Sequence, residues 1–501
     1  MRAKTRIGLL AASALLFGLA GCRDDEPTAP KGVPAPSLSS AEMNALAADV
    51  RQLTAGRGIT ALGEPPHVRP ALVRLGQALA FDKILSGNRD ISCMTCHLPG
   101  IATGDGRSLS IGQGATGLGP ARVHPQGLFI PRNSPSLFNM FALKSLFWDG
   151  RVSQDDAGTF HTPAGAALTP AMTQVFEFGA FSAQPLFPVL SREEMRAFSG
   201  NELAAIGDDH QAQIWAALMV RLGGIREYRR MFEAAYPGTR FDQMTFAHAS
   251  NAIAGFVTAK LGFNNSPWDR FLAGNNRAMT QVQLLGAKDF MTARCSICHN
   301  GPALTDNLFH NVALAQFGPG KGDGPSGRDD FGRMRETGVS TDQYAFRTPP
   351  LRNVELTAPY GHDGAFFSLR EFVDHYSESA LKLQHYNANQ LETALQGTVL
   401  PTFSDILATR DPLLTGVVFA PQTVDEVTEF NEGAHRSGRP QPPADSAGAG
   451  AERVAGGRGA GPQRGRRPRR VILASSRARL LSWVESTLGD PSGRRRTDVR
   501  D

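Results

Sequence analysis

The sequence predicts a mostly α-helical fold in two domains with long irregular loops. Five segments carry apolar residues at helical spacing: 70–82, 192–206, 210–235, 241–262 and 278–293. No segment has the alternation of an extended sheet. The 501 residues are enough for two or three domains with cores of their own, and 53 Gly with 33 Pro indicate many loops, densest over about 98–135.

The N-terminus has the pattern of a bacterial secretion signal, which we place at 1–22. Basic residues among the first six precede an apolar run over 7–20, which is too short to favour a membrane-spanning helix. The run ends in a segment that resembles a lipoprotein box, so we expect lipid on Cys22 and a membrane-anchored protein. An ordinary signal peptide is the alternative. Arg23, where Asp would favour the inner membrane, indicates the periplasmic face of the outer membrane.

The two ends of the chain after this signal differ from its middle in composition. Residues 23–60 contain a Pro-rich tether and then a helix that begins at the capping pattern Ser39-x-x-Glu42. Residues 437–501 are rich in Arg and Gly and are predicted to be disordered. Residues 436–501 hold 15 Arg, no Lys and six acidic residues, so their net charge is +9 and the rest of the chain carries −4. A solvated tail without a nucleic-acid partner is expected, and binding of the tail to anionic lipid or nucleic acid is the alternative.

Two C-x-x-C-H motifs identify the cofactor. They are Cys93-Met-Thr-Cys96-His97 and Cys295-Ser-Ile-Cys298-His299. In such a motif two thiols bond the vinyl groups of haem and the adjacent His ligates the iron, so we expect two covalent haem c groups. A zinc site would need other partners, and a disulfide would leave the His unexplained. Haem c is attached outside the cytoplasm, in agreement with the secretion signal.

The distance between the motifs predicts how the haems are shared. The motifs lie 202 residues apart, whereas the motifs of a multihaem wire follow one another closely. We therefore predict two cytochrome c-type domains with one haem each. The N-terminal haem domain is placed over 61–275 and the C-terminal haem domain over 276–436.

Further segments surround the two motifs in a fixed order. They are Leu85-Ser-Gly-Asn88, Arg132-Asn-Ser-Pro135, Leu146-Phe-Trp-Asp-Gly-Arg151, Phe346-Arg-Thr-Pro-Pro-Leu-Arg-Asn-Val354 and Thr357-Ala-Pro-Tyr-Gly-His-Asp-Gly364. Over roughly residues 68–380 the chain resembles the bacterial di-haem cytochrome c peroxidase family, which includes MauG. The resemblance implies that the N-terminal haem meets hydrogen peroxide and that the C-terminal haem relays electrons.

The resemblance also carries roles to individual residues. His97 matches the proximal ligand of the peroxide-reactive haem iron, His299 that of the second iron, and Trp148 the residue between the haems. The alternative for Trp148 is a core aromatic. Three further positions match those that ligate a Ca²⁺ between the domains, two of them through backbone carbonyls: Asn133, Thr357 and Pro359.

The family pattern places a Gln, and ten residues later a Glu, over the first iron. Gln184 and Glu194 match this spacing. Cleavage of peroxide needs a group that moves a proton from one oxygen to the other, which suits a carboxylate. Because Ser191-x-x-Glu194 is also a capping box, a helix cap is the alternative for Glu194. An insertion between Trp148 and Gln184 leaves the shape of the pocket open.

The first departure from the family concerns access to the first iron. Peroxidases activated by reduction have Ser-Ile-Gly-His-Gly, with the His on the iron, where this chain has Ser110-Ile-Gly-Gln113-Gly. Gln is a poor haem ligand, so we expect an iron that is open to peroxide without activation. His124, in an inserted loop, is the alternative ligand.

The second departure concerns the distal ligand of the second iron. The family places it 14 residues after His362, where this chain has Tyr376. MauG has Tyr there and the other peroxidases have Met. A phenolate stabilises oxidised iron and lowers its potential, whereas a thioether does the opposite. Tyr376 also ends an apolar helical stripe that starts at Leu369, so a core position is the alternative, and it is compatible with ligation.

Together these features predict a periplasmic di-haem peroxidase. It would reduce hydrogen peroxide, or use it in the manner of MauG to oxidise a protein or another substrate. A small c-type cytochrome or a cupredoxin is the expected electron donor if no protein substrate supplies the electrons. The alternatives are a peroxide-detoxifying cytochrome c peroxidase and a non-catalytic di-haem electron carrier. The open first iron argues against the carrier, in which both axial positions are usually filled.

Overall fold

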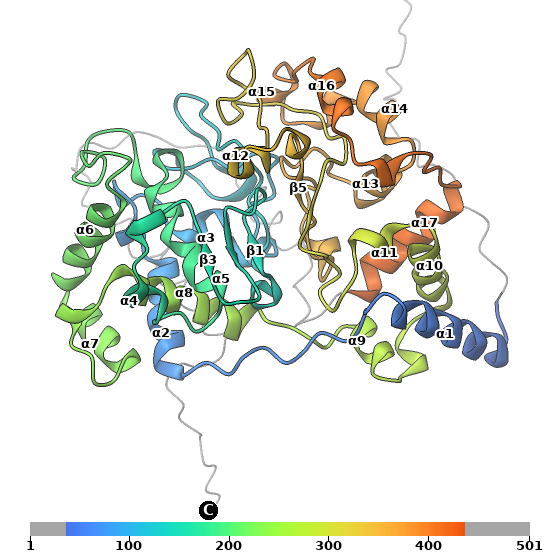
Figure 1. Ribbon diagram of the computed structural model, residues 1–501, viewed down its shortest axis with the longest axis horizontal. Coiled ribbons are helices and arrows are strands. Elements are labelled where there is room, and N and C mark those ends of the chain that lie inside the picture. The colour runs from blue at the N-terminus through green and yellow to red at the C-terminus, as the bar shows by residue number, and fades with distance from the viewer. Residues whose placement is uncertain (1–36, 436–501) are drawn as a thin grey trace, which may run out of the picture. The chain divides into compact units, whose positions relative to one another are not determined.

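A computed structural model describes residues 37–435 (Figure 1). The secretion signal at 1–22 with Cys22, the tether up to residue 36, and the tail at 437–501 lie outside the described residues. Helices dominate the described part and its strands are two or three residues long, so the predicted mostly helical class is confirmed. None of the described helices combines the length and the apolar character needed to cross a membrane.

The first hydrophobic core surrounds α8 (Phe246–Leu261), which is buried along most of its length. α2 (Pro70–Phe81) packs on α8 so closely that a Cβ on Gly76 would lie 1.8 Å from the carbonyl oxygen of Ala252. Glycine at position 76 therefore permits this short distance between the helices. Three more helices complete the core: α5 (Ala180–Ala183), α6 (Gln211–Gly223) and α7 (Arg226–Ala235).

The second hydrophobic core surrounds α10 (Gln281–Thr292). α17 (Pro421–Glu429) lies so close that a Cβ on Gly286 would be 1.9 Å from the carbonyl oxygen of Glu426. α13 (Leu369–His375) and the N-terminal helix α1 (Ser40–Ala55) also pack here. Figure 1 shows α1 beside α10, although the two are far apart in the sequence. The sequence did not predict that the first helix joins the core of the second half.

Two of the predicted helices differ from those observed. The helix predicted over 192–206 is wrong, because the chain forms only one π-helical turn, η8 (Arg192–Arg196), and leaves it at Ala197, whose φ is 73°. The segment 210–235 forms α6 and α7 with a break at Gly224, instead of one helix. The other predicted helices are observed within a few residues of their expected ends.

Two small antiparallel sheets position the loops between the cores. One has β1 (Ser145–Leu146), β2 (Val152–Gln154) and β3 (Phe160–His161), in that order. The other pairs β4 (Phe309–His310) with β5 (Phe346–Arg347). The backbone N–H of Arg347 in β5 donates to the carbonyl oxygen of Trp148 at 2.8 Å, so this bond fixes the β1–β2 turn against the second sheet.

The remaining helices are short and lie within the loops. They are α3 (Cys93–Cys96), α4 (Pro170–Thr173), α9 (Pro267–Leu272), α11 (Cys295–Cys298), α12 (Met334–Thr337), α14 (Ser379–Gln384), α15 (Thr393–Gln396) and α16 (Phe403–Ala408). α3 and α11 are the two C-x-x-C turns, each followed directly by the His of its motif.

Candidate active site

The first motif lies on the wall of a cavity of about 160 Å³, the first cavity. Nδ1 of His97 is 3.0 Å from the carbonyl oxygen of Thr103, and because a carbonyl only accepts, Nδ1 carries the proton. Burial lowers the pKa of His97, so Nε2 is a free lone pair suited to a metal. Burial raises the pKa of both thiols in the motif, that of Cys93 to about 11. Two neutral thiols and one such imidazole fit a covalent haem.

The second motif lies on a larger cavity of about 220 Å³, the second cavity. Nδ1 of His299 donates to the carbonyl oxygen of Leu304 at 3.0 Å, which again leaves Nε2 as the lone pair. Burial lowers the pKa of His299 and raises that of the Cys295 thiol to about 12. The residues of the second motif therefore fit the same group as those of the first.

Tyr376 follows the end of α13 and lines the second cavity together with His299. Within residues 37–435 its hydroxyl has no hydrogen-bond partner, and burial raises its pKa. The side chain of Tyr376 is half-buried, and a phenol that borders a cavity becomes a better ligand when a cation such as an iron stabilises its anion. The adjacent His375 is occupied elsewhere, since its Nε2 donates to the carbonyl oxygen of Val312 at 2.8 Å.

Trp148 lines both cavities. Its side chain is 9% exposed and its Nε1 donates to the carbonyl oxygen of Asn133 at 3.0 Å. The residue is thus a core aromatic and also the shared wall of the two cavities, so the two predicted roles are compatible in space.

The three residues expected at Ca²⁺, namely Asn133, Thr357 and Pro359, all line the second cavity. The amide nitrogen of Asn133 donates to the carbonyl oxygens of Arg107 and Ser108 at 2.9 and 3.3 Å, which leaves its Oδ1 as an acceptor. In the described part of the chain no group of three acidic, His or Cys side chains gathers at this point. A cation there would rely on neutral oxygens, which a hard cation accepts.

Gln184 and Glu194 both line the first cavity, from the end of α5 and from η8. The Ser191 hydroxyl accepts from the backbone N–H of Glu194 at 3.2 Å and donates to the Glu193 carboxylate at 3.2 Å. The helix cap therefore uses the backbone of Glu194, while its carboxyl group borders the cavity. Burial raises the pKa of this carboxyl group, and the charges of Arg151 and Lys321 partly oppose that rise.

Gln113 and His124, the residues expected to decide whether the first iron is open to peroxide, lie outside the lining of the first cavity. The amide oxygen of Gln113 accepts from the Asn88 side chain at 3.0 Å, and Nδ1 of His124 accepts from the backbone N–H of Gln126 at 3.1 Å. Neither belongs to the described residues that line the first cavity.

Four cationic residues line the first cavity, and the sequence analysis gave none of them a role: Arg132, Arg151, Lys321 and Arg347. Arg347 lines both cavities and is buried, and burial lowers its pKa to about 10. Lys321 comes from a glycine-rich loop of the second half. That glycine-rich run was the available signal, but nothing in the sequence indicated which cavity the loop borders.

A buried ion-pair network includes two of these cations. Arg132 donates to Asp149 at 2.5 Å and to Asp330 at 2.6 and 2.8 Å, and Arg151 also pairs with Asp149 at 2.9 Å. Because Arg132 and Asp149 precede the second motif and Asp330 follows it, the network joins the two halves of the chain.

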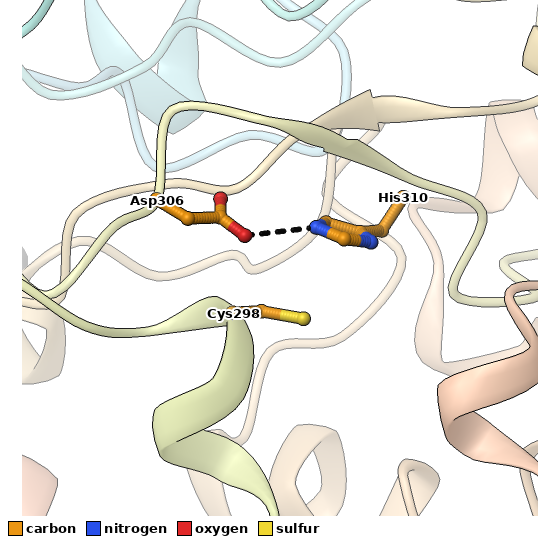
Figure 2. Close-up of side chains that lie close together, drawn as sticks. All are labelled: Cys298, Asp306 and His310. Carbon is orange, nitrogen blue, oxygen red and sulfur yellow. Dashed lines mark hydrogen bonds and ion pairs between the residues drawn. The ribbon is translucent and has the colours of Figure 1, made fainter. Parts of the chain in front are cut away.

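Cys298, Asp306 and His310 come together beside the second motif (Figure 2). Nε2 of His310 contacts Asp306 at 3.0 Å and Nδ1 contacts Asp411 at 2.5 Å. Burial lowers the pKa of His310, but Asp306, Cys298 and Asp411 raise it more, to about 11. Both ring nitrogens are thus engaged by carboxylates, and Cys298 belongs to the haem motif. His310 therefore forms ion pairs with Asp306 and Asp411 through both ring nitrogens, and neither nitrogen is left to bind a metal.

Comparisons of the sequence agree with this arrangement. Residues 70–277 match the family model of the di-haem cytochrome c peroxidases. Cytochrome c551 peroxidase of Pseudomonas aeruginosa is 31% identical over 299 residues, which cover 60% of this chain and 69% of that protein. Methylamine utilization protein MauG of Methylophilus methylotrophus is 26% identical over 313 residues, which cover 62% of this chain and 72% of that protein.

Two solved structures share the fold. A MauG-like protein associated with microbial copper homeostasis superposes with a TM-score of 0.52 at 24% identity, over 75% of this chain and 93% of its own. The diheme peroxidase BthA from Burkholderia thailandensis gives a TM-score of 0.50 at 18% identity, over 74% of this chain and 86% of its own. At these identities the likeness concerns the fold alone.

Proposed function

The chain belongs to the di-haem cytochrome c peroxidase family, and from this membership we propose how its own residues carry out peroxidase chemistry. The protein is a peroxidase-type oxidoreductase of two haems. We propose that both haems are covalent, one at Cys93, Cys96 and His97 and the other at Cys295, Cys298 and His299, in two cytochrome c-type domains. The haem iron, when bound, supplies the oxidising chemistry.

One observation carries the proposal for the first cavity. Gln184 and Glu194 share that cavity with His97 and both cysteines of its motif. The reaction consumes hydrogen peroxide, two protons and two electrons and yields two waters. Glu194 takes the proton from one peroxide oxygen and delivers it to the other, which leaves as water. The Gln184 amide donates a hydrogen bond that orients peroxide for this transfer.

Electrons reach this cavity from the second one through Trp148. Trp148 is in position for this role because its ring borders both cavities and its Nε1 is fixed by the Asn133 carbonyl oxygen. Tyr376, which lines the same cavity as His299, would be a second protein ligand of the haem there, as expected of a MauG-like enzyme that oxidises a protein or other substrate. A peroxidase supplied by a small c-type cytochrome or a cupredoxin is the second candidate, favoured by the likeness to cytochrome c551 peroxidase.

The remaining assignments extend the proposal beyond the two cavities. Ca²⁺ would be held by Asn133, Thr357 and Pro359, the oxygen-rich part of the second cavity. We propose that the enzyme works in the periplasm, anchored by lipid on Cys22 and facing inward from the outer membrane. The secretion signal and lipoprotein box support this location.

The test is a titration of the fully ferric holoprotein with one equivalent of hydrogen peroxide, without prior reduction, followed by optical spectroscopy. A prompt and long-lived change that involves both haems is expected. No change until one haem is reduced would contradict an open first iron and would favour a peroxidase blocked by a ligand such as His124. Loss of peroxide without any spectral change of either haem would argue against the whole assignment.

A further inference from the structure

The first cavity receives two charged side chains from the second half of the chain, Lys321 and Arg347. Lys321 lines it together with Glu194, Gln184 and Arg151. Within residues 37–435 no carboxylate lies at ion-pair distance from the Lys321 ammonium, and no hydrogen bond from it is found. Burial lowers its pKa, as expected for an ammonium removed from water. A half-buried ammonium without a protein partner is free to pair with an anion, and the cavity that it lines is the place for one.

The loop that carries Lys321 is held rigidly. The backbone N–H of Lys321 donates to the carbonyl oxygen of Asp329 at 2.8 Å, and its own carbonyl accepts from Arg335 at 3.0 Å. Gly320 has a φ of 62°, and a Cβ there would lie 1.8 Å from the carbonyl oxygen of Arg328. Only glycine permits this turn. The loop therefore has a fixed shape that directs Lys321 toward the cavity.

The other charged side chains around Lys321 have hydrogen-bond or ion-pair partners of their own. Arg132 pairs with Asp330, and Arg151 pairs with Asp149. Arg347 donates to the backbone carbonyls of Phe147 and Thr348 at 3.2 and 3.1 Å. Glu193 accepts from the Ser191 hydroxyl. Of the charged groups near Lys321, Glu194 is the one whose carboxyl group faces the cavity without a cation at ion-pair distance.

We propose that Lys321 is an anion-binding residue of the first cavity, where its ammonium stabilises a small anion such as deprotonated hydrogen peroxide and favours the ionised form of Glu194. This inference deepens the proposed function and rests on it for the identity of the physiological anion. The cavity is therefore completed by a loop from the half of the chain that carries the other haem motif. Removal of the charge weakens anion binding without removing either proximal His.

The probe is sodium azide, an anion that binds ferric haem, titrated optically into the fully ferric holoprotein between about pH 5 and 9. Lys321→Gln is expected to raise the dissociation constant of azide at least about tenfold, because one charge within about 12 Å contributes about 1.4 kcal/mol or more at an effective dielectric constant near 20. Lys321→Arg keeps the charge and should restore most of the affinity. Lys144→Gln is the matched control, because Lys144 is exposed and pairs with Asp156.

The pH dependence provides a second readout that a purely structural role would not move. Ionisation of Glu194 repels azide, so affinity falls as pH rises, and in Lys321→Gln this fall should shift to higher pH. Gly320→Ala keeps every charge but displaces the loop that carries Lys321, so this variant should also weaken azide binding. It replaces Lys321→Gln as the test if Lys321→Gln does not fold. Unchanged azide affinity and pH dependence in Lys321→Gln, or unchanged affinity in Gly320→Ala, would overturn the inference. A wild-type protein that binds azide through Lys321 but ignores peroxide would refute the proposed function alone.

Discussion

Arg132 is the residue whose removal should destabilise the protein most clearly through charge alone. Its guanidinium lies between Asp149 and Asp330, and the three side chains are 8%, 2% and 4% exposed. In Arg132→Leu the volume is roughly kept but both carboxylates remain buried. Arg151 still pairs with Asp149, whereas Asp330 keeps no cation at ion-pair distance among the described residues. Loss of one partner from a buried pair costs about 3–5 kcal/mol of unfolding free energy, because an uncompensated charge stays in the interior.

The loss of stability in Arg132→Leu should depend on pH, and the pKa shifts of Asp149 and Asp330 determine whether it is larger at neutral or at low pH. Burial raises the pKa of Asp149 and Asp330, but Arg132 outweighs burial, so both pKa values lie below the ordinary value in the native protein. A lowered native pKa stabilises the fold above the unfolded pKa of about 4, and this stabilisation is lost as pH falls through the native value. In Arg132→Leu burial of Asp330 loses its largest opposing effect, and the pKa of Asp330 rises. The variant should therefore be most destabilised near neutral pH, and the difference from wild type should shrink below about pH 4.

Equilibrium urea unfolding of the holoprotein, followed by circular dichroism at several pH values, measures both quantities. Arg69→Gln is the control, because the Arg69–Glu177 pair is 47% and 36% exposed and should contribute only about 0–1 kcal/mol. If Arg132→Leu lost less than about 1 kcal/mol at neutral pH, or if its deficit grew at low pH, the network would not act as a buried charge cluster.

Three further substitutions test other parts of the molecule. Glu194→Gln should slow the reaction with peroxide by about 10²–10⁴-fold and abolish the increase of its rate with pH. In the wild type the rate increases as the Glu194 carboxyl group ionises, and burial has raised the pKa of this group. Stopped-flow mixing across pH measures the rate, and a rate of the variant that still increased with pH would exclude Glu194 as the base. Tyr376→Met should raise the reduction potential of the second haem, because a thioether would replace a phenolate as its ligand. A redox titration measures this potential. If the potential were the same in the variant and the wild type, Tyr376 would be only a core residue. Gly76→Ala should lower the free energy of unfolding by about 1–3 kcal/mol, because the new Cβ would lie 1.8 Å from the Ala252 carbonyl oxygen. Gly63→Ala is the control and should leave stability unchanged, because a Cβ at position 63 has no atom within 4 Å. Equal stability of the two variants in thermal or urea unfolding would show that α2 and α8 can separate freely.

The helices that the sequence predicted well have a clear start, either a capping box or a Pro in the first turn, and a continuous apolar face. The pattern Ser39-x-x-Glu42 opens α1 as expected, and the run from Pro70 gives α2. The helix expected over 192–206 failed because periodicity carries no information about φ, and Ala197 takes a φ of 73° that ends the helix. That the first helix packs on α10 is a long-range contact, which no local pattern encodes.

The sequence revealed the site residues that belong to a local motif, and it missed those whose place in the site depends on long-range contacts. Cys93, Cys96 and His97 are read from adjacent positions, because haem attachment fixes their spacing. Glu194 required a likeness to a family, since its sequence context also satisfies a helix cap. Lys321 had neither a motif nor a likeness to point to it. Its position depends on how the loop 318–330 turns at Gly320 and on which cavity that loop borders.

The two halves share the walls of both cavities, and this has consequences for the chemistry. Trp148 from the first half and Arg347 from the second line both cavities, and a backbone hydrogen bond of 2.8 Å joins them. Lys321 lines the first cavity although it follows the second motif in the sequence. Arg132 and Arg151 from the first half also line the first cavity, so its positive charge comes from both halves of the chain. If the first motif holds a haem as proposed, the chemistry at that haem would depend on the arrangement of the second half, through Lys321 and through the Arg132–Asp330 pair beside its loop.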